Sequence, residues 1–188
     1  MRTLGSRQVY RNAWMTVRED QVERDDGSTG IYGVVDKPDF ALVIPAADNG
    51  FWLVEQFRYP AGRRAWEFPQ GSWSLGAAGT GADLARTELA EETGLHAREL
   101  RHLGHLFAAY GFSSQGFDVY LATGLTAGPA APEPSEQDLR HTFVSAPELD
   151  AMIRRRDVVD AASLAAHHLL LLDGAQPAYR ADPTTTQD

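Results

Sequence analysis

A cluster of three glutamates on one predicted helix constrains this chain more than any other feature of its sequence. Residues three and four apart share one face of a helix, so Glu88, Glu91 and Glu92 project together. Like charges at this spacing disfavour the helix by about 0.2–0.5 kcal/mol per pair. A hard divalent cation reverses that cost, and magnesium uses few carboxylates while taking further ligands from water and phosphate oxygens. The spacing therefore fits either a solvated acidic face or a Mg²⁺ site for a diphosphate.

The helix that carries these glutamates has recognisable ends. It is predicted over residues 81–93, with Thr80 as N-cap, Asp83 three residues later and Gly94 where the helix stops. Its remaining small and apolar residues form a neighbouring face that can pack on a sheet, namely Ala82, Ala85, Leu89 and Thr93.

The order of the predicted elements indicates an α+β fold with a mixed sheet. A strand pair over residues 17–35 precedes several strands, the acidic helix and further strands. Two helices follow, one capped by Ser145 and one with Asp160 as its N-cap and Gly174 at its end. The predicted strands of the main sheet lie at residues 40–45, 51–59, 65–69, 100–109, 117–122 and 141–145.

Composition excludes several classes of protein. The 188 residues contain no cysteine, which excludes disulfide scaffolds, cysteine-ligated metals and cysteine nucleophiles. The formal net charge of −9 argues against DNA or RNA held on a basic face. No apolar run approaches the length of a membrane span, and the first ten residues are too polar for a signal peptide. We therefore expect a cytoplasmic protein without a membrane or DNA partner.

A pair of histidines resembles a metal-binding pair only superficially. His102 and His105 lie in a predicted strand, where a spacing of three places side chains on opposite faces. We therefore do not expect them to meet.

The sequence around the acidic helix resembles the Nudix box, G-x5-E-x7-R-E-U-x-E-E-x-G-U, where U is aliphatic. Its second half matches residues 88–95 without a gap. The resemblance implies an α/β/α sandwich with a mixed sheet, and Mg²⁺- or Mn²⁺-dependent hydrolysis of nucleoside diphosphate derivatives. The segments 55–59, 66–69 and 110–115, with the N-terminal strands, resemble the ADP-ribose pyrophosphatase branch. That branch implies ADP-ribose or a nucleotide sugar as substrate, and a homodimer that exchanges its N-terminal strands.

The resemblance also divides the chain into three parts. Residues 1–36 are expected to form the N-terminal strand pair used in dimerisation, residues 37–176 the hydrolase domain, and residues 177–188 a flexible tail.

Site residues follow from the same resemblance, position by position. It implies Glu88, Glu91, Glu92 and the main-chain carbonyl of Gln70 as metal ligands, with Glu91 and Glu92 also counted as catalytic. Glu136, in an acidic loop after the box, is the candidate base. Gln115 stands where relatives often carry a glutamate, and an amide cannot act as a base.

Substrate contacts are implied at four further positions. Arg58 is the expected phosphate partner, because its motif position faces the substrate in the family. Trp14 and Tyr32 match positions that stack an adenine, and Phe112 is a further aromatic candidate in the substrate loop. Packing or dimer contacts are the alternative interpretation of the aromatic residues.

The first half of the box departs from the family pattern. Gly71 and Glu88 are 17 residues apart where the pattern has 15, no acidic residue lies between positions 71 and 82, and Thr87 replaces the arginine. In the family, that arginine and the early glutamate pair with each other and help to orient the helix glutamates. Loss of both partners together is compatible with activity, with Arg86 or Asp83 as possible replacements. The alternatives are an inactive nucleotide-binding sensor and, because Gln70 replaces a common alanine, a dinucleoside polyphosphate or RNA 5′-pyrophosphate hydrolase.

Overall fold

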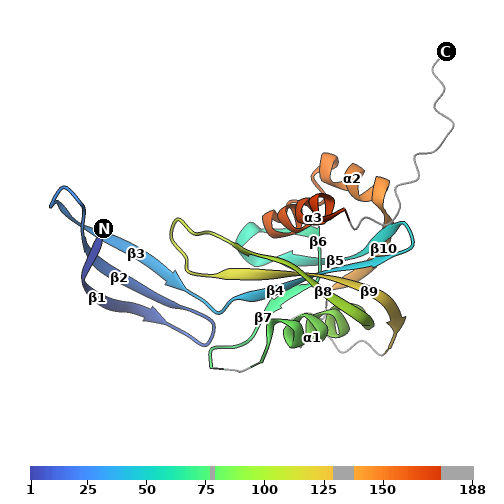
Figure 1. Ribbon diagram of the computed structural model, residues 1–188, viewed down its shortest axis with the longest axis horizontal. Helices are drawn as coiled ribbons and strands as arrows, with labels where there is room; N and C mark the ends of the chain where they lie inside the picture. The colour runs from blue at the N-terminus through green and yellow to red at the C-terminus, as the bar shows by residue number, and fades with distance from the viewer. Residues whose placement is uncertain (77–78, 129–137, 175–188) are drawn as a thin grey trace, which may run out of the picture.

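The chain forms two β-sheets, and the computed structural model describes residues 1–76, 79–128 and 138–174. The first sheet is an antiparallel meander of β1 (Arg2–Arg11), β2 (Thr16–Glu23) and β3 (Thr29–Asp36), which projects away from the rest of the molecule (Figure 1). The second sheet contains β4 (Phe40–Ala47), β5 (Gly50–Arg58), β6 (Arg63–Glu67), β7 (Gln70–Ser72), β8 (Leu95–Phe107), β9 (Gly116–Ala127) and β10 (Arg140–Ser145). A short 3₁₀ turn, η1 (Tyr59–Ala61), links β5 to β6.

The second sheet is mixed, as the sequence predicted. Its strand order is β10-β5-β4-β9-β8, with β6 paired to β5 and β7 paired to β4. The pair β4 and β9 is parallel, and the other pairs of the described strands are antiparallel. This order places β4 at the centre of the sheet, where it is covered on both faces.

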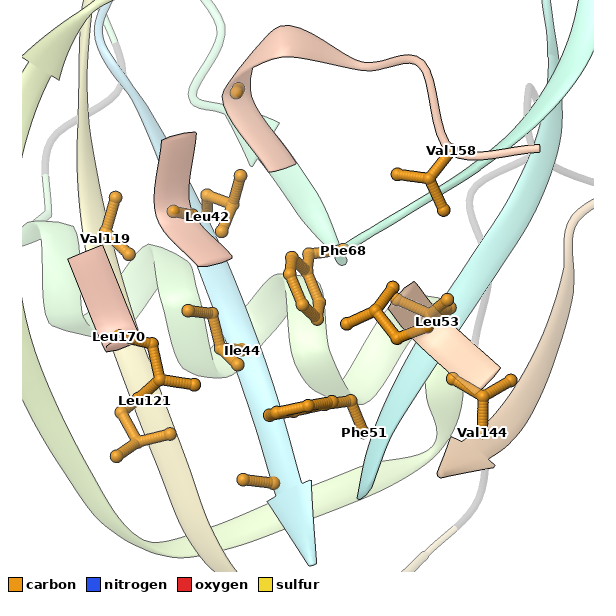
Figure 2. Packing of buried hydrophobic residues seen from close by; sticks show 14 of the residues in the cluster. Leu42, Ile44, Phe51, Leu53, Phe68, Val119, Leu121, Val144, Val158 and Leu170 are labelled. Carbon is orange, nitrogen blue, oxygen red and sulfur yellow. The ribbon is translucent and has the colours of Figure 1, made fainter. Parts of the chain in front are cut away.

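Alternate residues of β4 define two hydrophobic cores, as period-two strand geometry requires. Leu42 and Ile44 face α2 (Ala146–Arg155) and α3 (Ala161–Asp173), in the cluster shown in Figure 2. Ala41 and Val43 face α1 (Gly81–Thr93) on the opposite side. The second sheet therefore lies between α1 and the α2–α3 pair, which confirms the expected sandwich (Figure 1).

The predicted ends of α1 are confirmed in detail. The Thr80 hydroxyl accepts a hydrogen bond from the Asp83 amide at 3.1 Å, and the Asp83 carboxylate accepts one from the Thr80 amide at 3.2 Å. Gly94 ends the helix in the left-handed region with φ of 67°. These two caps fix where α1 begins and ends, and so they fix the part of the helix in which Glu88, Glu91 and Glu92 lie.

The N-terminal sheet has one strand more than the predicted pair. The additional strand, β1, is exposed along its whole length, so it lacks the apolar alternation from which strands are recognised. Ion pairs to β2 lie along it instead, with Arg2 to Glu23 at 2.6 Å and Arg7 to Glu19 further along the strand.

The prediction that His102 and His105 lie on opposite faces of a strand is wrong. Strand β8 contains a bulge, because His102 pairs with Tyr120 and Gly104 pairs with Val119, which leaves Leu103 as an extra residue. The extra residue restores a common face, and both imidazoles contact Asp118 Oδ1, at 2.8 and 3.2 Å.

Candidate active site

The acidic face of α1 lies against strand β7. The Gln70 amide donates a hydrogen bond to Glu92 Oε2 at 3.1 Å, and Glu92 is only 2% exposed. A methyl group on Gly71 would overlap the carboxylate of Glu88, so the glycine permits the close approach of that side chain. Glu91 lies on the same helix and is half-buried. Glu88 and Glu92 therefore both meet the main chain of the two-residue segment 70–71.

A partly buried ion pair between Arg58 and Glu67 lies at the end of β6, just before this segment. Arg58 makes a two-pronged contact with Glu67, with Nε donating to Oε2 at 3.2 Å and Nη2 to Oε1. Gln56 donates to the same carboxylate at 3.0 Å. The Glu67 side chain is 3% exposed, whereas the Arg58 side chain is 43% exposed. The buried acid therefore anchors a guanidinium that still reaches solvent.

The pKa shifts of the two partners reflect this difference in burial. Burial raises the pKa of Glu67, and the attraction and hydrogen bond of Arg58 offset only part of that effect. Burial also acts to lower the pKa of Arg58, but Glu67 outweighs it, together with the charges of Glu92 and Asp160, and raises that pKa overall. A raised pKa disfavours the charged form of an acid and favours the charged form of a base. Glu67, the more deeply buried partner, is therefore harder to ionise, whereas Arg58 is harder to neutralise. Arg58 accordingly stays cationic at every physiological pH.

A second hydrogen-bonded chain ties the same segment to α3. The Phe68 amide donates to Ser163 Oγ at 2.9 Å, and Ser163 Oγ donates to Asp160 Oδ2 at 2.8 Å. The side-chain amide of Gln70 also donates to Asp160 Oδ2, at 3.0 Å. Segment 67–71 is therefore held by β5, by α1 and by α3 at once.

The groups around segment 67–71 fit a hard divalent cation. The carboxylates of Glu88 and Glu92 and the Gln70 carbonyl are oxygen donors, which Mg²⁺ and Mn²⁺ prefer. Within the described ranges, no group of three or more His, Asp or Glu side chains is arranged to hold a metal ion. Magnesium needs only one or two protein carboxylates, because water and phosphate oxygens complete its shell.

The predicted aromatic substrate contacts lie on the N-terminal sheet and on the loop that contacts it. Trp14 in the β1–β2 turn is 64% exposed, Tyr32 on β3 is 40% exposed and Phe112 is 58% exposed. The Tyr32 hydroxyl donates to the Gly111 carbonyl at 2.7 Å, and the Val35 amide donates to the Phe112 carbonyl at 2.8 Å. The structure thus joins the loop that carries Phe112 to the N-terminal sheet. Among the described residues, no hydrogen bond or ring contact links these aromatic side chains to Arg58.

The candidate bases have separate outcomes. Glu136 lies outside the described residues. Gln115 is 9% exposed, and its side-chain amide donates to the Pro38 carbonyl at 2.8 Å, which gives it a structural role at the start of β4.

Both residues suggested as replacements for the lost box pair make other contacts in the structure. Arg86 donates to the Ala97 carbonyl on β8 at 2.8 Å, and Asp83 is engaged in the N-terminal cap of α1. Helix α1 is held by its two caps, by the hydrogen bond from Gln70 to Glu92 and by the packing of its Leu89 on the sheet.

Sequence reasoning missed the roles of Glu67, Asp160 and Ser163. Glu67 lies inside a run that resembles the family, but its contact with Arg58 depends on the register of β5 and β6. Asp160 was predicted only as a helix cap, which it is, with its carboxylate accepting from the Ser163 amide at 2.8 Å. A polar residue three positions after that cap was the one signal for Ser163.

Comparison with curated proteins gives relatives that the chain covers over two thirds or more of their length. The chain is 33% identical to an ADP-ribose pyrophosphatase of Mycobacterium tuberculosis over 93% of its own length and 86% of that protein. It is 26% identical to an ADP-ribose pyrophosphatase of Bacillus subtilis over 95% and 97% of the two chains. A methanol dehydrogenase activator of Bacillus methanolicus is 28% identical over 66% of this chain and 67% of its own length.

Comparison with solved structures supports the same fold. The crystal structure of an ADP compounds hydrolase superposes with a TM-score of 0.82 and 19% identity, covering 94% of this chain and 96% of that one.

Within the described residues, no helix has the length and apolar character needed to cross a bilayer.

Family matches cover both sheets. Residues 1–35 match the N-terminal domain of nucleoside diphosphate sugar hydrolases, and residues 36–175 match the NUDIX domain. The second range contains the glutamates of α1, the Arg58–Glu67 pair and segment 67–71. The chain therefore belongs to the NUDIX family of hydrolases.

Proposed function

We propose that this chain hydrolyses the diphosphate linkage of ADP-ribose or a nucleotide sugar, with Mg²⁺ or Mn²⁺ as its cofactor. The observation that carries the proposal is the placement of segment 67–71. One end of it anchors the phosphate-binding candidate Arg58, and the other end contacts Glu88 and Glu92. The likeness of the chain to two ADP-ribose pyrophosphatases supports the substrate.

Hydrolysis requires that a water oxygen bond to one phosphorus while the bridging phosphorus–oxygen bond breaks. The products are two monophosphates, AMP and ribose 5-phosphate in the case of ADP-ribose. A bound divalent cation supplies charge neutralisation at the phosphate and a water of lowered pKa.

The chain's own residues bind and orient in this reaction. Glu88 and Glu92, with the Gln70 carbonyl, hold the cation, and Glu91 is a further candidate ligand on the same helix face. Arg58, which stays cationic and is fixed by Glu67, binds a phosphate oxygen and keeps the diphosphate in line for attack. Glu136 remains our proposed acceptor of the proton that the water loses.

We also propose that the protein is a homodimer built through its N-terminal sheet. Strand β1 pairs only with β2 in the described chain, and its other edge is open over ten residues. Exposed apolar side chains on the same sheet favour a partner, namely Leu4, Val9, Ile31 and the proposed adenine contacts Trp14 and Tyr32. Light scattering tests this proposal, and a monomer at micromolar concentration would contradict it.

Two other activities have an observation in their favour. The gapped match to the Nudix box, in which Thr87 replaces the arginine and the early glutamate is missing, favours a nucleotide-binding sensor without turnover. Gln70 favours a dinucleoside polyphosphate or RNA 5′-pyrophosphate hydrolase. A panel of these nucleotides with Mg²⁺ or Mn²⁺, with products separated by chromatography, distinguishes the three activities.

A further inference from the structure

A pocket of about 560 Å³ lies on the α3 side of the second sheet, next to segment 67–71. Its polar wall includes Gln70 and Asp160, the residues joined by the hydrogen bond described above. Much of the remaining wall is aromatic and includes Phe107 and Tyr110. Phe40 and Phe117, stacked at 4.6 Å between ring centroids, line it as well. The pocket therefore offers apolar surface with an acid at one edge, close to the proposed site of cleavage.

The hydrogen bonds of Asp160 are unevenly divided between its two carboxylate oxygens. Oδ2 accepts three, from the Ser163 amide and hydroxyl at 2.8 Å each and from the Gln70 side chain at 3.0 Å. Within the described residues, Oδ1 accepts no hydrogen bond. The three donors fix the orientation of the carboxylate of Asp160, a residue that lines the pocket, and Oδ1 keeps its capacity to accept hydrogen bonds.

We infer that Asp160 is a specificity-determining residue, whose Oδ1 accepts a hydrogen bond from a sugar hydroxyl of the substrate in this pocket. A carboxylate pairs well with ribose hydroxyls and repels a phosphate placed on the same sugar, as dinucleotide-binding proteins use it. The inference rests on the proposed hydrolysis and sharpens it. It selects substrates whose terminal sugar presents free vicinal hydroxyls here, and disfavours substrates that place a further phosphate here.

The charge around the pocket agrees with this selection. Asp160 lies near enough to act on the pKa values of both Arg58 and Glu67. Arg58 is the cation of this group, and Glu67 already holds it. A diphosphate is thus attracted toward Arg58, while a further phosphate beside Asp160 meets a like charge.

The test is Asp160→Asn, which exchanges one atom of the pocket wall and keeps a good helix cap. The three donors hold the amide oxygen in the place of Oδ2, so the NH₂ group replaces Oδ1 and an acceptor becomes a donor. The kcat/KM for ADP-ribose is measured beside that for an ADP derivative whose terminal sugar lacks its vicinal hydroxyls. Wild type is expected to prefer ADP-ribose by about ten- to a hundredfold, the worth of one hydrogen bond to a charged group. The NH₂ group can still donate to a hydroxyl oxygen, but that neutral hydrogen bond is weaker than one to a carboxylate, so the variant is expected to lose most of the preference, mainly through KM.

Two further variants keep the test independent of folding. Asp160→Ser retains a capping hydroxyl, lacks Oδ1 and is expected to lose the same preference. Ser145→Ala removes the corresponding cap of α2, where Ser145 accepts from the Glu148 amide at 3.3 Å, and is expected to keep the preference. Calorimetry with a non-hydrolysable ADP-ribose analogue repeats the comparison without turnover.

The outcomes separate this inference from the proposed function. If wild type hydrolyses ADP-ribose and both Asp160 variants discriminate as it does, the inference is wrong and the proposed function stands. If wild type shows neither turnover nor binding of ADP-ribose, the proposed function fails and the inference fails with it. Equal loss of preference in Ser145→Ala would also overturn the inference, because the effect would then belong to helix stability.

Discussion

The main-chain amide of Gln70 donates to the Glu92 carboxylate across 3.1 Å, while its side-chain amide donates to Asp160 at 3.0 Å. One residue of β7 thus connects the acidic helix on one face of the sheet with α3 on the other. Through this connection α1 is tied to the sheet, although this chain lacks the arginine–glutamate pair that helps to orient the helix glutamates in the family.

Gly71→Ala tests the contact between β7 and Glu88. The added methyl group overlaps the Glu88 carboxylate, so that side chain must move. We expect turnover to fall by about ten- to a hundredfold, since a displacement of about 1 Å costs about that much in a catalytic constellation. Gly33→Ala on β3, with open space around it, is the matched control and is expected to retain activity. Equal activity of the two variants would contradict the placement of Glu88.

Arg58→Ala tests the proposed phosphate contact. We expect kcat/KM for ADP-ribose to fall by about ten- to a hundredfold, because one charge-assisted hydrogen bond is lost. The control is Arg63→Ala, whose exposed guanidinium donates to main-chain carbonyls, that of Arg156 at 3.0 Å among them. Steady-state kinetics of the two variants decide the matter, and a similar loss in both would assign the effect to general charge.

Glu67→Gln tests the cost of burying that acid. The pKa of Glu67 is raised by burial, so the native state holds its proton at pH values where the unfolded chain has released it. The stability of wild type relative to the variant is therefore greatest below the unfolded-state pKa of about 4.5 and falls as pH rises through the folded-state pKa. Urea unfolding of both proteins between about pH 4 and pH 8 measures this difference. A difference that stays constant over the range would show that Glu67 does not titrate as the structure implies.

Local patterns in the sequence predicted much of the fold. The caps of α1, the Asp160 cap of α3 and the buried run of β4 are each encoded by residues that are close in sequence. Strand β1 was not predicted, because ion pairs to β2 take the place of an apolar face. The shared face of His102 and His105 was not predicted, because a single bulge residue moves the side chains of all later positions of β8 to the opposite face.

The site was predictable only where a family motif marked it. The helix spacing and the resemblance together pointed to Glu88 and Glu92, and the structure brings both to β7. The partnership of Arg58 with Glu67 could not be predicted, because it depends on strand register. The link from Gln70 to Asp160 joins residues 90 positions apart and depends on the packing of α3.

Hydrolysis of ADP-ribose by wild type and Glu92→Gln, with Mg²⁺ or Mn²⁺ and after chelation, tests the central claim most directly. The variant keeps an oxygen that can accept from the Gln70 amide and loses the charge that a cation requires. Glu99→Gln, at an exposed glutamate on β8, is the matched control. We predict that wild type and the control release AMP only with metal, and that Glu92→Gln neither releases AMP nor binds Mn²⁺ as wild type does. Undiminished turnover in Glu92→Gln, or nucleotide binding without turnover in wild type under every metal condition, would contradict the account.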